Sequence, residues 1–186
     1  MKDEVQETVL FGGVEKREIE ISPYDPHWPE VFQSHATIIG NALGSAAMRI
    51  EHIGSTSVPG LGAKPIVDIL LVVEDSAGES SYRTQMEQAG YQLRVREPAF
   101  DEHRMFRTQE RDVHIHVFSP TSPEIERYLT FRNRLRTNPV DRQLYEKTKR
   151  KLAKKEWSDM NAYAEAKSEV VEQIIGEAQA AGEIYG

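Results

Sequence analysis

The chain has 186 residues, of which 39% are hydrophobic and 28% are charged, and its formal net charge is −7. This composition is typical of one globular domain, and no apolar run approaches the roughly 20 residues that a membrane span needs. Because the chain contains no cysteine, disulfides, thiolate metal sites and cysteine nucleophiles are excluded, and any metal would be held by carboxylate, imidazole or water.

The N-terminal segment, residues 1–17, predicts a flexible leader, because it is highly charged and shows little periodicity. It is acidic and is interrupted by Gly12 and Gly13, so it lacks the basic and apolar blocks of a signal peptide. We therefore expect a cytoplasmic protein.

Apolar periodicity predicts the elements that follow, up to residue 120. A helical apolar stripe begins at Pro29, which suits a first helical turn, and ends before Gly44. Short alternating or continuous apolar runs predict strands. The expected strands are 18–21, 48–53, 65–73, 91–96, 103–108 and 112–118, and a second helix is expected at 79–89.

After Pro120 the pattern changes to helices, which are expected at 123–136, 140–155 and 159–179, the last interrupted loosely at Gly176. Strands first and helices last indicate an α+β domain, a mixed sheet flanked by helices with a helical C-terminal segment. A single domain is expected over residues 18–186, with a sheet core at about 18–120 and C-terminal helices at about 121–182.

Basic residues gather in the helical part. From Arg127 to Lys155 there are eleven Lys and Arg against Asp141 and Glu146, a local balance of +9. Such a segment is either a solvated helix face or one wall of a site for an anionic ligand. We do not expect a nucleic-acid or membrane partner, because no nucleic-acid motif is present and few aromatic residues interleave with the charges.

The most informative segment is IEHIGSTSVPGLGAKPIVDILLVV, residues 50–73. It is not a P-loop, because Lys64 is followed by Pro65 where that motif needs a hydroxyl residue. Glycine lets a backbone approach a ligand, hydroxyls and N–H groups bind phosphate oxygens, and a carboxylate on the next strand can hold a divalent cation. Gly54, Ser55 and Asp68 are therefore typical of a site for a nucleotide and magnesium.

This segment also resembles the GrpB family. EHIGSTSVPGLGAKPIVDI is preceded by YDPHW and followed by HIHVF, FRNRLRTNP and LYEKTKRKLA, in the order of that family. The resemblance spans roughly residues 19–175 and implies a nucleotidyltransferase-like fold without a particular reaction. In the wider superfamily a Gly-Ser motif precedes an acidic pair, and here the second acid is replaced by Leu70.

The missing carboxylate leaves two interpretations open. Alternate residues of a strand share a face, so His114 and His116 lie together and could complete a metal site with Asp68. These three residues would then be catalytic, Asp68 and His116 would be metal ligands, and the cation would be Mg²⁺ or Mn²⁺ before Zn²⁺. Alternatively, the fold binds a nucleotide without transferring it.

The expected partner is a nucleotide or another phosphorylated small molecule, with an unknown acceptor. A metal-dependent hydrolase built on the same acid and histidines, and a non-catalytic nucleotide-sensing or interaction module, are the alternative functions. The residues expected to bind phosphate are His52, Gly54, Ser55, Thr56, Lys64, Arg132 and Arg136. Of these, His52 could instead support the turn, and the two arginines could form ordinary helix salt bridges.

Overall fold

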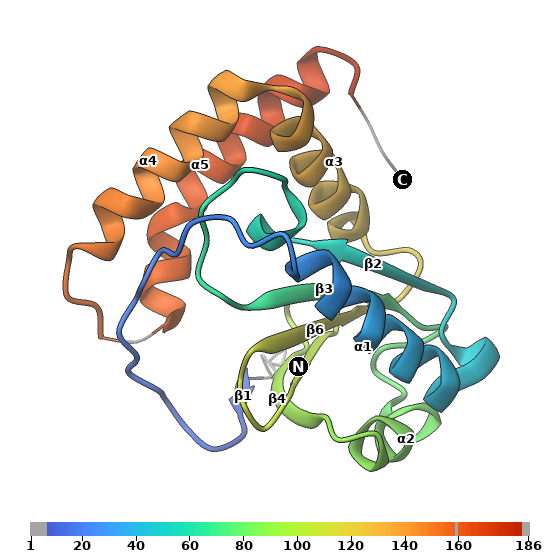
Figure 1. Ribbon diagram of the computed structural model, residues 1–186. Helices are drawn as coiled ribbons and strands as arrows, with labels where there is room; N and C mark the ends of the chain where they lie inside the picture. The colour runs from blue at the N-terminus through green and yellow to red at the C-terminus, as the bar shows by residue number, and fades with distance from the viewer. Residues whose placement is uncertain (1–6, 159, 184–186) are drawn as a thin grey trace, which may run out of the picture.

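The computed structural model describes residues 7–158 and 160–183 (Figure 1). One mixed six-stranded sheet has the order β1-β4-β5-β6-β3-β2. The parallel pair is β3 and β6, and every other neighbouring pair is antiparallel. The strands are β1 (Val9–Leu10), β2 (Arg49–Ile53), β3 (Val67–Val72), β4 (Gln92–Glu97), β5 (His103–Arg107) and β6 (Val113–Phe118).

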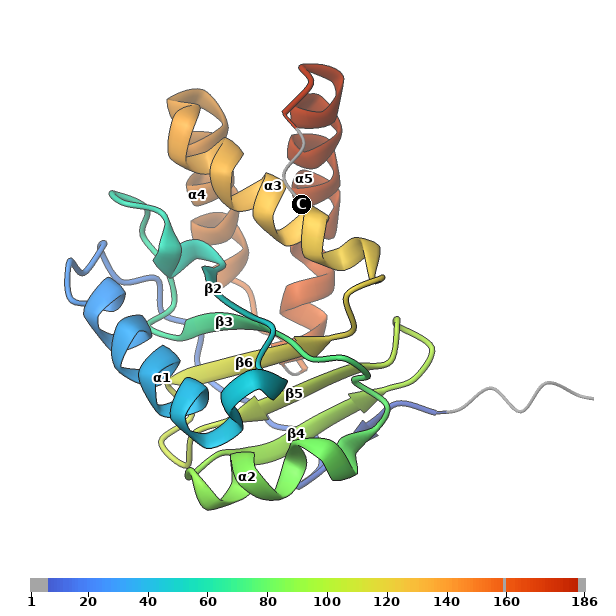
Figure 2. The same cartoon turned by 90° about the vertical axis from the view of Figure 1, so that its right-hand side faces the viewer.

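Helices cover both faces of this sheet (Figure 2). The first two lie on one face, and the last three form a group over the other face, around the end of β3. The helices are α1 (Trp28–Leu43), α2 (Arg83–Gln88), α3 (Pro123–Thr137), α4 (Pro139–Ala153) and α5 (Met160–Ala180). None of the described helices is long and apolar enough to cross a membrane.

Local signals explain where the helices begin. Proline occupies the first turn of α1, α3 and α4, where its missing N–H is not needed. The Ser122 hydroxyl accepts a hydrogen bond from the Glu124 N–H, and the Asn138 side chain accepts one from the Asp141 N–H. These caps satisfy N–H groups that have no partner within the helix.

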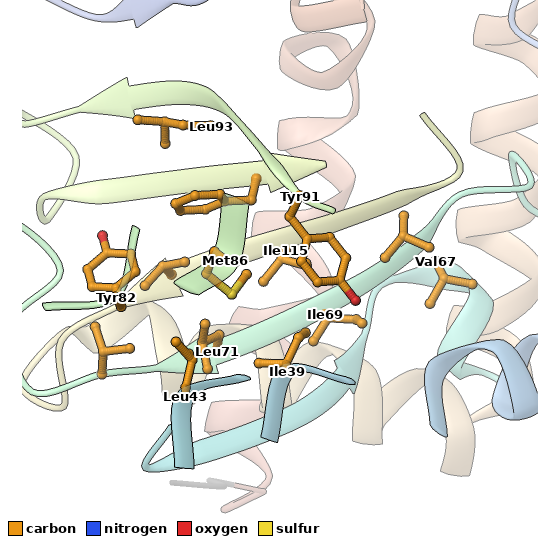
Figure 3. Packing of buried hydrophobic residues seen from close by; sticks show 14 of the residues in the cluster. Ile39, Leu43, Val67, Ile69, Leu71, Tyr82, Met86, Tyr91, Leu93 and Ile115 are labelled. Carbon is orange, nitrogen blue, oxygen red and sulfur yellow. The ribbon is translucent and has the colours of Figure 1, made fainter. Parts of the chain in front are cut away.

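The two faces of β3 and β6 carry different residues. Figure 3 shows Ile69 and Ile115 packed toward Ile39 of α1 and Met86 of α2 in the main core. The alternate residues face α3 instead, where Leu70 belongs to a second apolar cluster. The predicted separation of valine and isoleucine from His114 and His116 in β6 is therefore confirmed, and the histidines lie on the face toward the C-terminal helices.

The α+β class, with a mixed sheet and a helical C-terminal segment, is confirmed, but two predicted elements differ. Residues 18–21 form no strand, and only the neighbouring Ser22 makes an isolated bridge, to Ala63. The helix predicted at 79–89 begins as a 3₁₀ turn, Glu79–Ser81, before α2. The loose break predicted at Gly176 is also absent, since α5 runs continuously through it.

The predicted leader differs over its described part, residues 7–17. Val9 and Leu10 pair with β4 and extend the sheet (Figure 1). The Glu15 carboxylate receives two hydrogen bonds of 2.9 Å from the Arg107 guanidinium. The many charged residues of this segment predicted a solvated leader. In the structure, the charge of Glu15 instead forms a partly buried ion pair with Arg107 of β5.

Candidate functional site

A pocket of about 380 Å³ lies between the end of the sheet and the C-terminal helices. Six of the residues predicted from the sequence line it: Gly54, Ser55, Lys64, Asp68, His114 and His116. Helices α3, α4 and α5 supply the opposite walls. The pocket therefore joins the Gly-Ser segment to the basic C-terminal part.

The Gly54–Ser55 turn follows β2 directly and packs against Asp68. Gly54 has φ 72° and ψ −174°, a conformation used almost only by glycine. A Cβ at this position would lie 2.7 Å from Asp68 Oδ2. Ser57 closes the turn, because its hydroxyl donates a 2.5 Å hydrogen bond to the Gly54 carbonyl. Glycine is thus required both for the backbone and for the approach of the carboxylate.

Asp68 is the acid of the pocket. Its Oδ1 lies 3.0 Å from His116 Nε2 and 4.0 Å from His114 Nδ1, and its side chain is 31% exposed. Burial by itself raises the pKa of Asp68. The hydrogen bond from His116 and the nearby charge of Lys64 together lower the pKa by more than burial raises it, so it lies below its ordinary value. Asp68 is therefore ionised at neutral pH.

The histidines do not form a metal centre with Asp68. Among the described residues, no three His, Asp or Glu side chains converge as a group that could hold a metal ion. His116 Nε2 is engaged in a hydrogen bond with Asp68 Oδ1. A metal ion held by Asp68 and His116 alone stays a prediction. Burial also lowers the pKa of His114 to about 4, so this imidazole is neutral.

Three lysines, in contrast, line the pocket, of which Lys149 is buried and Lys64 and Lys167 are half-buried. Lys149 of α4 is 2% exposed, and its Nζ donates hydrogen bonds to Ser55 Oγ at 3.0 Å and to the Gly62 carbonyl at 2.6 Å. Lys64 and Lys167 both place Nζ over the Tyr163 ring, at 4.7 and 4.8 Å from its centroid. The basic groups of the pocket are thus three lysines, of which the sequence analysis had named only Lys64.

Burial lowers the pKa of Lys149 to about 6 and that of Lys64 to about 7, and in both cases the charge of Lys167 lowers the pKa further. An ammonium group in such surroundings gains much from a nearby anion. Lys149 could not be distinguished beforehand from the other basic residues of its segment, because only the packing of α4 brings it to Ser55.

The structure places the other predicted phosphate ligands behind the turn, away from the pocket. His52 and Thr56 are buried and hydrogen-bonded to each other, with 2.9 Å between His52 Nε2 and Thr56 Oγ1. Arg132 Nη1 donates to the His52 carbonyl at 3.0 Å and to Glu51 at 2.9 Å. Arg136 Nε donates to the Ser57 carbonyl at 2.9 Å. These side chains hold the turn in place.

The rest of the pocket lining combines apolar and polar groups. Arg127 forms ion pairs with Glu124 and with Glu172 of α5. Burial raises the pKa of Glu124 above its ordinary value. The apolar and aromatic lining consists of Ile53, Ile66, Tyr128, Phe131, Tyr145, Val171 and Ile175. These side chains suit an uncharged, flat or apolar portion of a ligand.

Comparisons with known proteins agree on one family. The model of the GrpB protein family matches residues 18–177. A UPF0157 protein of Halalkalibacterium halodurans is 48% identical over 180 residues, which are 96% of this chain and 92% of that protein. A UPF0157 protein of Streptomyces coelicolor is 47% identical over 180 residues, 97% of this chain and 95% of that protein.

A solved structure agrees as well. The crystal structure of conserved protein GrpB from Enterococcus faecalis has a TM-score of 0.76 and 33% sequence identity to this chain, covering 86% of this chain and 96% of that one. The match thus extends over nearly the whole of both chains. The chain belongs to the GrpB family, as the motifs of its sequence predicted.

Proposed function

We propose that the pocket binds a phosphorylated small molecule, with a nucleotide as the expected class. The observation that carries this proposal is that Lys64, Lys149 and Lys167 line the same pocket as the Gly54–Ser55 turn, with Lys149 bonded to Ser55. Within residues 7–158 and 160–183, no ion pair joins any of these lysines to a carboxylate. Clustered, partly desolvated lysines without a carboxylate partner favour an anionic ligand, which would stabilise their charged form.

The pocket offers a place for each part of such a ligand. Ser55 and the two most buried lysines, Lys64 and Lys149, would bind phosphate oxygens at the Gly-Ser end. The aromatic and aliphatic wall formed by α3 and α5 would pack against the base. A volume of about 380 Å³ is within the range of small-molecule sites.

Transfer of a nucleotidyl group has weaker support than binding. The position of the second acid in the superfamily is occupied by Leu70, which is fully buried with Ile53, Phe118 and Leu129. A divalent cation, Mg²⁺ or Mn²⁺, stays a prediction and would enter with the phosphates, as Mg²⁺ commonly does. We do not propose the hydrolase alternative, since the described donors form no metal centre on which it could depend.

Isothermal titration calorimetry with ATP, ADP, adenosine and inorganic phosphate tests the proposal, each with and without Mg²⁺, Mn²⁺ or Zn²⁺. We expect binding of the phosphorylated compounds and none of adenosine alone at the same concentration. Binding of neither nucleotide nor phosphate under any of these conditions would refute the proposal. Turnover of ATP in the presence of a metal would show that the protein also catalyses transfer or hydrolysis, in addition to the proposed binding.

A matched pair of variants locates the site on the same helix. Lys149→Met removes the buried ammonium of α4, whereas Lys147→Met removes an exposed one two residues away. We expect Lys149→Met to weaken ATP binding at least tenfold, about 1.4 kcal/mol, and Lys147→Met to leave it unchanged. Equal affinities in the two variants would place the ligand elsewhere.

A further inference from the structure

Lys149 combines deep burial with a place in the wall of the pocket. Its side chain is 2% exposed, yet it lines the cavity of about 380 Å³. Its Nζ lies 3.0 Å from Ser55 Oγ, 2.6 Å from the Gly62 carbonyl oxygen and 4.9 Å from the centroid of the Tyr145 ring. A ligand in the pocket can therefore reach an amine that bulk water hardly touches.

The groups around this amine are mostly cations. The facing charged and titratable groups are Lys64, Lys167 of α5, and Tyr145, Glu146 and Arg150 of α4 itself. The Glu146 carboxylate forms no ion pair with Lys149 among the described residues, and its Oε1 accepts a hydrogen bond from the Gly62 N–H. Lys149 thus lies among like charges and is not neutralised by a carboxylate.

These surroundings favour an uncharged amine. Burial and the charges of Lys167 and Lys64 lower the pKa of Lys149 to about 6, although the charge of Glu146 raises it. At pH 7 most of this amine is uncharged, whereas less than about 0.1% of an exposed lysine is uncharged. A desolvated lysine beside other cations is an arrangement that makes an amine nucleophilic at neutral pH.

The three lysines occupy two places in the pocket. Lys64 and Lys167 both place Nζ over the Tyr163 ring, whereas Lys149 places Nζ over the Tyr145 ring. A ligand with a phosphate group and a second reactive group can therefore engage both places at once. The phosphate would lie beside Lys64 and Lys167, and the second group beside Lys149.

We infer that Lys149 is a nucleophile that forms a Schiff base with a phosphorylated aldehyde or ketone. The inference rests on the proposed function for recognition of the phosphate, and goes beyond it by assigning a covalent bond to Lys149. A nucleotide has no aldehyde or ketone, so with that ligand Lys149 would take up a proton and act as a cation. With a carbonyl compound it reacts as the free amine.

The reaction balances with water as its by-product. The Nζ lone pair forms a bond to the carbonyl carbon as the π bond to oxygen breaks, and one proton passes from Nζ to that oxygen. The second Nζ proton then leaves with the hydroxyl group as water, and the C=N bond forms. The Ser55 hydroxyl, 3.0 Å from Nζ, can pass each proton from nitrogen to oxygen. The step needs no oxidant or reductant.

Pyridoxal 5′-phosphate, an aromatic aldehyde with one phosphate, is a suitable probe. The whole protein is mixed with it at pH 7, the imine is reduced with borohydride, and the labelled lysines are identified by peptide mass spectrometry. We expect Lys149 to be labelled at least about tenfold faster than Lys147, an exposed lysine of the same helix. Labelling of Lys149 no faster than that of Lys147 overturns the inference.

Two variants assign the fast reaction to one amine. Lys149→Met is expected to abolish the fast phase of labelling, and Lys147→Met is expected to leave it unchanged. Fast labelling that persists in Lys149→Met overturns the inference. If Lys149→Met does not fold, the relative rates of the two lysines within the unaltered protein decide.

The pH dependence separates a nucleophile from a lysine that only holds the loop in place. With pyridoxal, which has no phosphate, labelling of Lys149 is expected to speed up as pH rises through about 6 and then to level off. Lys167→Gln removes a neighbouring cation and is expected to move this midpoint to higher pH. A rate that keeps rising above about pH 8, as for an ordinary lysine, or a midpoint that Lys167→Gln leaves in place, overturns the inference.

Comparison of the two probes distinguishes this inference from the proposed function. We expect pyridoxal to label Lys149 at least about tenfold more slowly than pyridoxal 5′-phosphate does, because it lacks the charge-assisted contacts of the phosphate. Equal rates would refute recognition of the phosphate, and with it the proposed function, while the nucleophile would stand. Binding of ATP without fast labelling of Lys149 would overturn the Schiff base and leave the proposed function intact.

Discussion

The carboxylate of Asp68 lies against Gly54 so closely that a Cβ on residue 54 would be 2.7 Å from Oδ2. The glycine and the acid, which the sequence separates by an irregular loop, therefore form one unit. A side chain on residue 54 would therefore displace the carboxylate.

Replacement of this glycine tests the unit. Gly54→Ala introduces both a strained backbone, which costs about 1–3 kcal/mol, and a contact with Asp68. Gly60 in the same loop also has a positive φ, 80°, but a Cβ added there would have nothing within 4 Å. We expect Gly54→Ala to lower the free energy of unfolding, measured with urea, by about 1 kcal/mol more than Gly60→Ala does. Equal losses would show that backbone strain alone matters.

Anion affinity is expected to rise as pH falls. Burial lowers the pKa of Lys64 to about 7 and that of Lys149 to about 6, so both lysines are largely neutral at pH 8 and must take up protons to bind an anion. Sulfate is a suitable probe because its own charge is constant in this range. Calorimetry from pH 8.5 to 5.5 should show affinity increasing about tenfold per pH unit for each linked proton and levelling off below about pH 6.

The same profile in Lys149→Met provides the check. Removal of this lysine is expected to make the pH dependence shallower, with the remaining change centred near the pKa of Lys64, about 7. A profile that keeps its full slope without Lys149 would contradict the assignment of this proton uptake.

Glu15 is expected to stabilise the fold at neutral pH and to lose this effect in acid. Its hydrogen bonds from Arg107 hold the pKa of Glu15 at about 2, against burial, which raises it. Since this folded-state pKa is below the ordinary value of 4.5, the contribution is complete above about pH 4.5 and disappears as pH falls toward 2. Glu15→Gln should lower the free energy of unfolding at pH 7 by about 1–3 kcal/mol.

The control for this change is Glu18→Gln, which alters an exposed carboxylate in the same segment. We expect it to change the free energy of unfolding by less than about 0.5 kcal/mol. If Glu15→Gln changes the free energy of unfolding as little as Glu18→Gln does, residues 7–17 contribute little to stability. A flexible leader would then describe this segment better than a docked one.

Restoring the second acid at residue 70 is expected to fail. Leu70 is fully buried in the apolar cluster beneath α3, so Leu70→Ala should cost about 2–5 kcal/mol of unfolding free energy through the cavity it leaves. Leu70→Asp should cost more, because it also buries a carboxylate. Denaturation of both variants, with and without Mn²⁺, measures this. A stable Leu70→Asp variant that gains metal affinity would contradict it.

The sequence predicted the part of the site that depends on local spacing. Strand alternation placed His114 and His116 on one face, and the Gly-Ser motif with Asp68 placed the acid beside the turn. His103 and Glu97 were missed because the contact of His103 with His116 depends on how β5 pairs with β6. The contact of Glu97 with His103 depends on how β4 pairs with β5, where the register shifts between Leu93 and Val95. No local pattern encodes such a shift.

The basic segment shows the same limit. Arg127 and Lys149 of this segment line the pocket, but charge does not say which cation faces inward. Arg132 and Arg136 were chosen for their helical spacing, and the packing of α3 directs them to backbone carbonyls behind the turn. Lys149 reaches the pocket because α4 packs against α5. This is tertiary packing, which a local sequence pattern does not encode.

The hydrogen bonds of Lys149 to Ser55 and Gly62 join residues 94 and 87 positions apart. The ribosome makes the Gly-Ser loop long before it makes α4, so the sheet can begin to fold while one wall of its binding site does not yet exist. The ability to bind is thus acquired last during synthesis. A chain interrupted before α4 would contain all six strands of the sheet but no closed pocket.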